Sequence, residues 1–503
     1  MALYGGIEIP GHPCLENVRK LDLLPIPLIR RAHRIGIAID PPYFKDLSLR
    51  FGTEILDLER DISSYIPVDR LREFSGVGAK EEDDDEDGRS ALDSTTDSRS
   101  IPSPHSSSSF NANSPDQMAK LLYDMLGIGA GKKLKTTNTG RTSTGKKQLE
   151  LIKLEHPVVP LVLRHRELSK LKLNYADKLP RLAVFHPHGS DCPVCGLRHP
   201  APTWRVHCEM GTTRADTGRI NHKNPNEGNI PTRTEDGQLI QGGHTATPGH
   251  KLVIADLSQI ELRGLAHLSN CKSMISVYES GGDIHDDNAR KVFKLAPNVK
   301  PDKIKHRMAA KRVGFGIQNG TTKKGLYMQL VMDYGANNLP IPDWLTEDWC
   351  QWFIDEFLRA NPEVQEYFEL QWYRARRYGM VWTSFGRIKL IPEVQSCHSW
   401  IRESGLRQAQ NMPVTGLAAD QLKLIMGKLD AILQKMWDQG VWVQPLLTVH
   451  DSVMTESEDK YAEEVLELTR DVMDQVMDDE QTGDRMFMAP IESDGLISER
   501  WTK

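Results

Sequence analysis

Two short apolar runs in the second half of the chain, each followed directly by an aspartate, constrain the fold most. Residues 252–255 (Leu-Val-Ile-Ala) precede Asp256, and residues 446–449 (Leu-Leu-Thr-Val) precede His450 and Asp451. Apolar runs of this length, rich in aliphatic and β-branched residues, are typical of buried strands. The pattern therefore predicts a sheet that presents carboxylates at the ends of its strands.

Long stretches with helical periodicity lie between and after these strands. Apolar residues recur every three or four positions in four segments, for which we predict helices: 303–330, 347–378, 402–437 and 460–477. Helices that are grouped separately from the strands, rather than alternating with them, indicate the α+β class.

A pair of strand-end aspartates is suited to chemistry at phosphorus. Two carboxylates on neighbouring strands can bridge two Mg²⁺ ions ~3.5–4 Å apart, one beside the attacking hydroxyl and one beside the leaving oxygen. Mn²⁺ would be an acceptable substitute, because it accepts the same oxygen ligands. Asp256 and Asp451 are accordingly the candidate metal ligands.

A second candidate feature is a stripe along one predicted helix. Arg307, Lys311, Phe315 and Asn319 recur at intervals of four residues, and such positions drift by only ~40° per step around a helix. The two cations can bind a triphosphate, the ring can pack against a sugar or base, and Lys311 can donate a proton to pyrophosphate.

The net charge of −6 hides an uneven distribution. Residues 81–99 hold nine Asp/Glu and two Arg, and without them 61 basic residues face 60 acidic ones. Residues 131–172 carry eleven Lys/Arg and three Glu. This excess could neutralise several phosphates, or it could be a solvated helical face. The acidic and Ser-rich segment 77–109 is predicted to be a disordered loop within a domain, because it has few large apolar residues.

The chain shows no sign of a membrane span or a secretory leader. No run of eighteen apolar residues occurs, and Met1 is not followed by a charged and then apolar segment. Seven Cys in 503 residues favour reduced thiols over a disulfide framework. We therefore expect a cytoplasmic protein without membrane contact.

Cysteine and histidine residues gather near 186–208. Cys192, Cys195 and His199 could hold a structural zinc ion, with His186, His188 or Cys208 as a further ligand. A single CxxC is a weak signal, and a plain polar loop is the alternative.

Three motifs in order resemble motifs A, B and C of the family A (DNA polymerase I-like) DNA polymerases. They begin at Asp256 (Asp-Leu-Ser-Gln-Ile-Glu-Leu-Arg), Arg307 (Arg-Met-Ala-Ala-Lys-Arg-Val-Gly-Phe-Gly) and Val449 (Val-His-Asp). Shorter similarities lie at 110–115, 217–219, 283–285 and 411–413, so the resemblance covers most of the chain.

The resemblance implies a right-hand architecture with a thumb, a palm built on an antiparallel sheet, and helical fingers. The expected bounds are an N-terminal extension 1–14, thumb 15–76 and 110–180, palm 181–270 and 385–503, and fingers 271–384. The Cys/His segment near 186–208 would be an insertion in the palm.

The resemblance also implies roles for single residues. Asp256, Asp451 and the backbone carbonyl of Leu257 would hold the metal ions, and Lys311 would be the general acid. The nucleotide contacts would be Arg307, Lys311, Phe315, His285, Gln259 and Glu261. Glu261 with Phe315 would exclude a ribose 2′-hydroxyl. The DNA contacts would be Arg219, Arg407, Asn411 and His450, which read shape more than sequence.

Several positions depart from the family pattern without removing a metal ligand. They are Leu257 for Tyr, Gly314 for Asn, Asn319 for Tyr, Thr415 for Gln, and Ser452 for the Glu beside the second aspartate. In the family, the Tyr that matches Asn319 lies near the templating base. Because Asn319 lacks that aromatic ring, we expect altered fidelity.

The function implied is template-directed addition of dNMP to a primer, without intrinsic 3′–5′ proofreading because few residues precede the thumb. The expected partners are primer-template DNA and dNTPs, together with a processivity factor or a separate exonuclease. We expect the protein itself to be a monomer. The compact chain suggests a phage origin. Two alternatives are a single-subunit RNA polymerase-like enzyme, which Glu261 disfavours, and a non-catalytic nucleic-acid-binding relative, which the intact Asp256, Asp451 and Lys311 disfavour.

Overall fold

The computed structural model describes residues 2–74, 110–131, 134–137, 140–189, 191–232, 234–296, 298–337 and 339–502. They form two compact units, Met1–Pro41 with Leu179–Lys503, and Pro42–Lys178. The predicted disordered loop 77–109 lies outside the described residues. The predicted thumb begins at residue 15, but residues 15–41 are grouped with the first unit. The division into thumb, palm and fingers stays a prediction.

The first unit is built on a four-stranded antiparallel sheet in the order β12-β13-β9-β14. The strands are β9 (His250–Leu257), β12 (Val443–Val449), β13 (Ser452–Glu458) and β14 (Ser493–Ser498). All seven residues of β12 are buried, as expected for a strand covered on both faces. The two predicted apolar strands are thus confirmed, and the α+β class with them.

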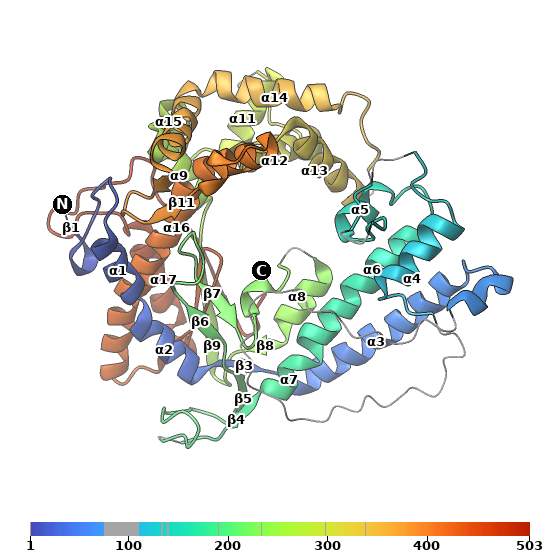
Figure 1. The fold of residues 1–503 in the computed structure, drawn as a ribbon. Helices are drawn as coiled ribbons and strands as arrows, with labels where there is room; N and C mark the ends of the chain where they lie inside the picture. Colours follow the sequence, from blue (N-terminus) through green and yellow to red (C-terminus); the bar gives the residue numbers. More distant parts are fainter. Residues whose placement is uncertain are drawn as a thin grey trace. The chain divides into compact units, whose positions relative to one another are not determined.

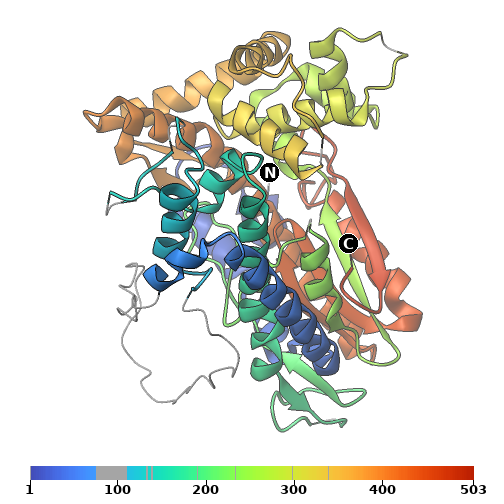
Figure 2. The ribbon, with the colours of Figure 1, turned by 90° about the vertical axis from the view of Figure 1, so that its right-hand side faces the viewer.

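Helices cover this sheet and extend beyond it. α17 (Ala462–Asp474) packs against β9 and β14, and α2 (Ile26–Ile35) packs against β12. α9 (Ile260–Ser269) and α15 (Pro362–Tyr378) pack against each other and against the long α16 (Ser399–Asp438). Figures 1 and 2 show the helices from α11 (Ile284–Phe293) to α15 gathered near one end of the sheet.

Two of the predicted helices are interrupted. The segment 303–330 divides into a π-helical turn (Lys303–Arg307), α12 (Met308–Gln318) and the first part of α13 (Lys323–Ala336). The break follows from Gly320, whose φ of 66° cannot continue a right-handed helix. The segment 347–378 divides at Pro362 into α14 (Glu347–Ala360) and α15, because proline disfavours helical backbone at the preceding residue. The predicted helices 402–437 and 460–477 are confirmed as α16 and α17.

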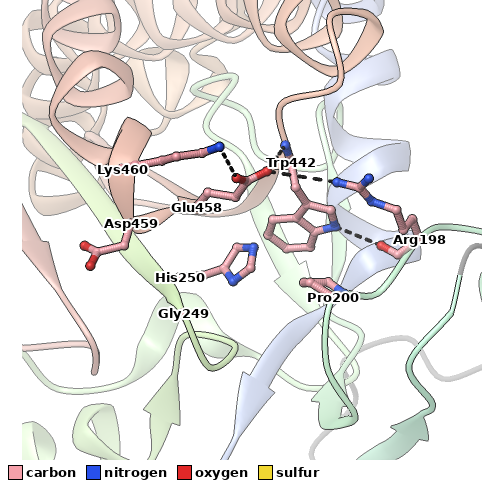
Figure 3. Close-up of a pocket in the computed structure, with 8 residues that line it drawn as sticks. All are labelled: Arg198, Pro200, Gly249, His250, Trp442, Glu458, Asp459 and Lys460. Atoms are coloured by element: carbon pink, nitrogen blue, oxygen red, sulfur yellow. Dashed lines mark hydrogen bonds and ion pairs between the residues drawn. The ribbon is translucent and has the colours of Figure 1, made fainter.

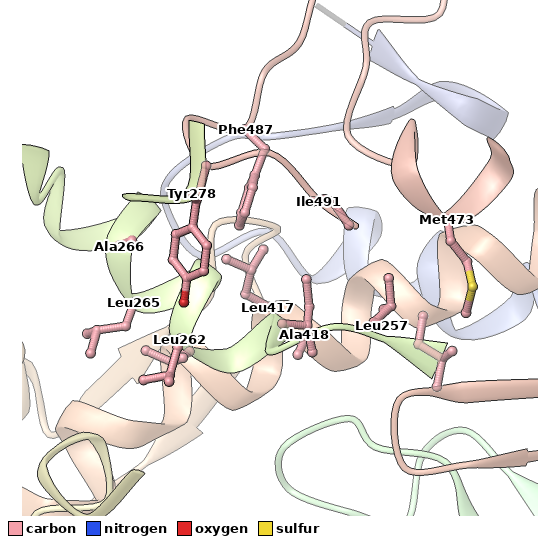
Figure 4. Packing of buried hydrophobic residues seen from close by; sticks show 14 of the residues in the cluster. Leu257, Leu262, Leu265, Ala266, Tyr278, Leu417, Ala418, Met473, Phe487 and Ile491 are labelled. Carbon is pink, nitrogen blue, oxygen red and sulfur yellow. The ribbon is translucent and has the colours of Figure 1, made fainter. Parts of the chain in front are cut away.

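The main apolar core joins the sheet to these helices. Figure 4 shows Leu262 and Leu265 of α9, with Leu417 of α16 between them and Leu257 of β9; these residues and Phe487 belong to one buried cluster. All five side chains are at most 4% exposed. The core therefore anchors the C-terminal end of β9, where Asp256 lies.

A second, smaller sheet has the order β4-β5-β3-β8. Its strands are β3 (Ile37–Ile39), β4 (Val184–His186), β5 (Thr203–Val206) and β8 (His244–Thr245). Arg205 of β5 donates to Glu456 of β13 over 2.5 Å, and neither side chain is exposed to solvent. This buried ion pair joins the two sheets.

The second unit is helical. Its main helices are α3 (Pro41–Ser63), α4 (Pro115–Ala119), α5 (Lys146–Leu151) and α6 (Val158–Leu171), and a π-helical turn (Lys120–Met125) continues α4. Ser114 caps α4 by accepting a hydrogen bond from the Gln117 N–H, as Ser before Pro at a helix start favours. Buried aliphatic side chains such as Leu121, Leu149 and Val162 form a core of its own.

Among the described residues, no helix combines the length and the apolar character that crossing a membrane requires.

Candidate active site

The sheet brings the two predicted metal-binding aspartates to the same end. Asp256 is the penultimate residue of β9 and lies opposite Ser452, the first residue of β13. Asp451 lies in the turn just before Ser452, and the Leu257 N–H donates to its carbonyl oxygen over 3.2 Å. Both aspartates are partly exposed. Two carboxylate side chains at neighbouring strand ends suit a hard cation such as Mg²⁺.

A third acid, which was not predicted from the sequence, lies in the same row. Asp494 of β14 is the register partner of Asp256 on the other side of β9, and it is exposed. Side chains directly opposite each other on paired strands share one face of the sheet. Asp494 therefore adds negative charge beside Asp256. Its strand carries Gly495 and lacks an apolar run, so the sequence offers no signal for it.

The backbone is left-handed at two non-glycine residues beside the aspartates. Gln259, the residue before α9, has a φ of 53°, and His450, the residue before Asp451, has a φ of 56°. This conformation costs an L-residue roughly 1–2 kcal/mol. The Tyr278 hydroxyl donates to Gln259 Oε1 over 3.4 Å, which helps to orient that side chain.

The predicted triphosphate-binding arginine is engaged by carboxylates. Arg307, directly before α12, forms ion pairs with Asp283 at 2.6 Å and with Asp286 at 3.0 Å. Asp283 also caps α11 (Ile284–Phe293). The hydrogen bond to Asp283 raises the pKa of Arg307 above its usual value. A bound triphosphate would have to exchange with these carboxylates.

His285 lies next to the α12 stripe. Its ring centroid is 5.8 Å from that of Phe315, and the residue is 2% exposed. Burial is the main cause that lowers the pKa of His285 to about 4; Asp283 opposes this shift, and the nearby Arg307 and Lys311 add to it. The imidazole is therefore neutral at pH 7 and would contact a nucleotide by hydrogen bonding, not as a cation. Lys311 itself is exposed on α12.

Glu261 lies in a polar network that also contains a residue the sequence analysis missed. Arg219 forms an ion pair with Glu261, and the Gln318 amide donates to Glu261 Oε2 over 3.1 Å. The same amide donates to Asn411 Oδ1 over 3.3 Å. Asn411 in turn donates to Asn319 over 2.9 Å. Gln318 is fully buried. The one sequence feature that could have indicated its role is that it is a polar residue on an otherwise apolar helix face.

A pocket opens beside this network. It is lined by Arg312, Phe315, Gly316, Asn319, Gly320, Thr321, Thr322, Gly325, Gln329 and Arg407. Arg407 of α16 lies against Gly320, where an added Cβ would overlap its side chain. The structure thus brings Phe315, Asn319 and Arg407 together on the wall of one pocket.

A different pocket lies at the other end of the sheet. Figure 3 shows His250, at the start of β9, and Glu458, at the end of β13, on its wall with Trp442. These residues are at the opposite strand ends from Asp256 and Asp451, so this pocket is separate from the candidate site.

The predicted zinc ligands are also brought together. Cys192, Cys195 and His199 lie with His186, whereas His188 is not in the group. Cys208 instead directs its thiol at the Pro225 carbonyl oxygen over 3.2 Å.

Comparison with known proteins gives one family. The chain matches the model of DNA polymerase family A over residues 95–503. It is 36% identical over 392 residues to the thermostable DNA polymerase I of Thermus aquaticus, a match of 78% of this chain and 42% of that protein. It is 32% identical over 475 residues to the DNA polymerase I of Deinococcus radiodurans, a match of 93% and 41%. The chain thus spans less than half the length of these relatives.

A solved structure is similar over nearly the whole chain. It is the polymerase domain of Pol1 from M. smegmatis in complex with DNA primer-template and dNTP. The TM-score is 0.72 with 25% sequence identity, and the match covers 97% of this chain and 72% of that one.

Proposed function

The chain belongs to DNA polymerase family A, and on that premise we propose that it is a DNA-directed DNA polymerase. It would extend a primer on a template by attack of the 3′-oxygen on the α-phosphorus of a dNTP. The bond to the β-phosphate oxygen breaks, and pyrophosphate leaves. The observation that supports this most is the pairing of β9 with β13, which places Asp256 and Asp451 at one sheet end.

The residues at this end fit a pair of Mg²⁺ or Mn²⁺ ions. Asp256, Asp451 and the Leu257 carbonyl are the oxygen donors proposed to hold them, and hard divalent cations prefer oxygen ligands. When bound, such ions activate the primer hydroxyl and stabilise the leaving oxygen.

The neighbouring helices supply groups for the triphosphate and the sugar. Arg307, Lys311, His285 and Gln259 would bind the triphosphate, and Lys311 would donate the proton that pyrophosphate takes up. Glu261 would pack with Phe315 against the sugar. Its ion pair with Arg219 and its hydrogen bond from Gln318 hold it in place. A rigid carboxylate is a better barrier to a 2′-hydroxyl than a mobile one.

The DNA contacts are proposed on the same basis. Arg407, Asn411, Arg219 and His450 would touch the primer-template, and the partners would be that duplex and dNTPs. The lack of intrinsic proofreading stays a prediction. It is tested by incubating the protein with a 3′-mismatched primer and no dNTP, where shortening of the primer would contradict it.

Primer extension tests the proposed activity. Wild type and Asp451→Ala are compared with Mg²⁺ and either dNTPs or rNTPs. Asp459→Ala is the matched control, since Asp459 follows the other end of β13 and is exposed. Primer extension with dNTPs that is kept in the control and lost in Asp451→Ala supports the proposal. Growth with rNTPs alone would favour an RNA polymerase. Growth that survives in Asp451→Ala would overturn the assigned site.

A further inference from the structure

The loop between β4 and β5 carries a four-residue cluster that the polymerase chemistry does not use. His186 ends β4, and Cys192, Cys195 and His199 follow on the loop drawn beside β4 in Figure 1. One atom from each side chain lies within 4.8 Å of the others. Three of the residues are at most 3% exposed, and Cys195 is partly exposed. Two thiols and two imidazoles in one buried group are the donor set of a structural zinc site.

Three of the six separations between the donor atoms are close to those of a tetrahedral site. Bonds of ~2.3 Å to sulfur and ~2.0–2.1 Å to nitrogen imply edges of roughly 3.3 Å for N–N and 3.6 Å for N–S. In the structure His186 Nδ1 is 3.1 Å from His199 Nε2. Cys192 Sγ is 3.4 Å from His186 Nδ1, and Cys195 Sγ is 3.1 Å from His199 Nε2. Each value lies within about 0.5 Å of the ideal edge.

A hydrogen-bond chain outside the cluster sets the tautomer of His186. The His33 carbonyl can only accept, so His207 Nδ1 carries the proton and donates to it over 2.7 Å. In a neutral ring, His207 Nε2 is then an acceptor, and it receives the Nε2–H of His186 over 2.9 Å. The remaining nitrogen of His186, Nδ1, therefore presents a lone pair to the cluster. Metal-binding histidines are commonly oriented by such an outer hydrogen bond.

The backbone of the loop holds the two cysteines on one side of a tight turn. The Gly196 N–H donates to the Cys192 carbonyl over 2.7 Å, and the Cys192 N–H donates to the Leu197 carbonyl over 3.2 Å. Gly196 has a φ of 66°, and an added Cβ would lie 3.2 Å from an Arg34 nitrogen. Gly189 and His199 pair through two further backbone hydrogen bonds of 3.1 and 2.9 Å. The turn and this pairing bring His199 back toward the cysteines.

We propose that His186, Cys192, Cys195 and His199 form a closed structural zinc site, with all four ligands supplied by this chain. The site would hold the loop against the body of the first unit. Arg34, in the last turn of α2, donates to the Cys195 carbonyl over 2.7 Å. Trp442 donates to the Arg198 carbonyl over 2.8 Å, as Figure 3 shows. The cluster adjoins β5 and lies away from Asp256 and Asp451, so its role would be stability and not catalysis.

Metal analysis of the full chain tests the site directly. Protein purified under reducing conditions without added metal should contain about one zinc per chain, as expected for a single closed site. Cys192→Ser should lose it, and the matched control Cys397→Ser, which changes an exposed cysteine outside the cluster, should keep it. Wild-type protein with less than about a tenth of an equivalent, both as purified and after refolding with ZnCl₂, would overturn the proposal. Zinc retained in Cys192→Ser would also overturn it.

A second measurement on wild type covers the case in which Cys192→Ser fails to fold. Removal of zinc by a chelator should lower the unfolding temperature and expose two thiols to a thiol reagent. Added ZnCl₂ should reverse both effects, and Co²⁺ should give the absorption of a tetrahedral thiolate site. A Cys192–Cys195 disulfide in zinc-free wild type, with ZnCl₂ unable to change the unfolding temperature, would overturn the proposal. Because none of these readouts requires DNA synthesis, failure here leaves the proposed polymerase activity untouched.

Discussion

The acidic residues at the start of β13 and Glu456 in its second half lie in opposite environments. At one end Asp451 and the neighbouring Asp256 are partly exposed, with Asp494 exposed beside them. About 13 Å along the strand, Glu456 is fully buried. Arg205 and the Thr247 N–H both donate to it over 2.5 Å. Arg205 also donates to the Gly36 carbonyl and the Thr247 hydroxyl. Charge that is buried and fully hydrogen-bonded holds the sheets together, whereas charge that solvent can reach is available for ligands.

Asp256→Asn should show the difference between the two environments most clearly, because it should affect primer extension but not stability. The change keeps the shape of the side chain but removes a proposed metal ligand, so we expect primer extension to fall by at least about a thousandfold. The unfolding temperature should stay close to that of wild type, because the side chain is partly exposed. Single-turnover extension and thermal unfolding measure the two quantities. A large loss of stability with normal extension would reverse the comparison.

Glu456→Gln should show the opposite pattern. Leaving Arg205 buried without its charge partner should lower the free energy of unfolding by about 3 kcal/mol, with extension at low temperature unchanged. Denaturant titration measures the stability. Glu499→Gln is the control, because Glu499 is exposed beside Lys251 and this change should leave the stability close to that of wild type.

The effect of Glu456→Gln on stability should also depend on pH. Burial alone would raise the pKa of Glu456, but Arg205 and the Thr247 hydrogen bonds bring it below its usual value of 4.5. A carboxyl with a lower pKa in the folded state adds stability above the unfolded pKa and loses it as pH falls through the folded pKa. The stability gap between wild type and Glu456→Gln should therefore shrink below pH 4.5. A gap that stays constant across that range would argue against the ion pair as its source.

Lys311→Ala extends the test to the exposed face of α12. If Lys311 is the general acid, catalysis should drop about a hundredfold while stability hardly changes. The pH-rate profile should also lose its alkaline limb, which a purely structural role would not alter. Lys324→Ala, an exposed lysine on α13, is the control. Equal effects in both variants would remove the assigned role.

Glu261→Ala should relax sugar selection. Without the carboxylate, the preference for dNTP over rNTP should fall by tens of fold, as measured by kcat/KM for each. Arg219→Ala removes the ion pair but keeps the carboxylate, which Gln318 still contacts. That variant should retain most of the preference. If both variants lose it equally, the ion pair and not the bulk of Glu261 sets the selection.

Asn319→Tyr should give the smallest effect. Position 319 is proposed to lie near the templating base, where an aromatic ring would add stacking, so misincorporation should fall several-fold. Stability should change by less than about 0.5 kcal/mol, because Asn319 is exposed. Single-nucleotide misinsertion assays measure the change. Unchanged misincorporation would contradict the expected link between this position and fidelity.

The sequence was most informative where a residue sits in a periodic pattern. Asp256 and Asp451 could be predicted because each follows an apolar run, and the register of β9 with β13 then brings them together. Asp494 could not, because its strand lacks such a run. The Arg205–Glu456 pair joins residues 251 positions apart, and neither belongs to a motif. Its existence depends on how two sheets pack.

The sequence also did not predict where the helices end, or which of several similar residues completes the cysteine and histidine cluster. The breaks at Gly320 and Pro362 carried local signals, but periodicity on both sides masked them. His186, His188 and Cys208 were equal candidates to complete the cysteine and histidine cluster. His186 belongs there because β4 pairs with β5 and so turns it toward the loop.

The left-handed backbone at Gln259 and His450 implies a trade-off between thermal stability and catalytic activity. Glycine at either position would remove the conformational cost, which is roughly 1–2 kcal/mol. It would also delete a side chain proposed to touch the incoming nucleotide or the primer terminus. Laboratory evolution for thermal resistance alone should therefore drift toward glycine at these two positions, and evolution under simultaneous selection for DNA synthesis should not.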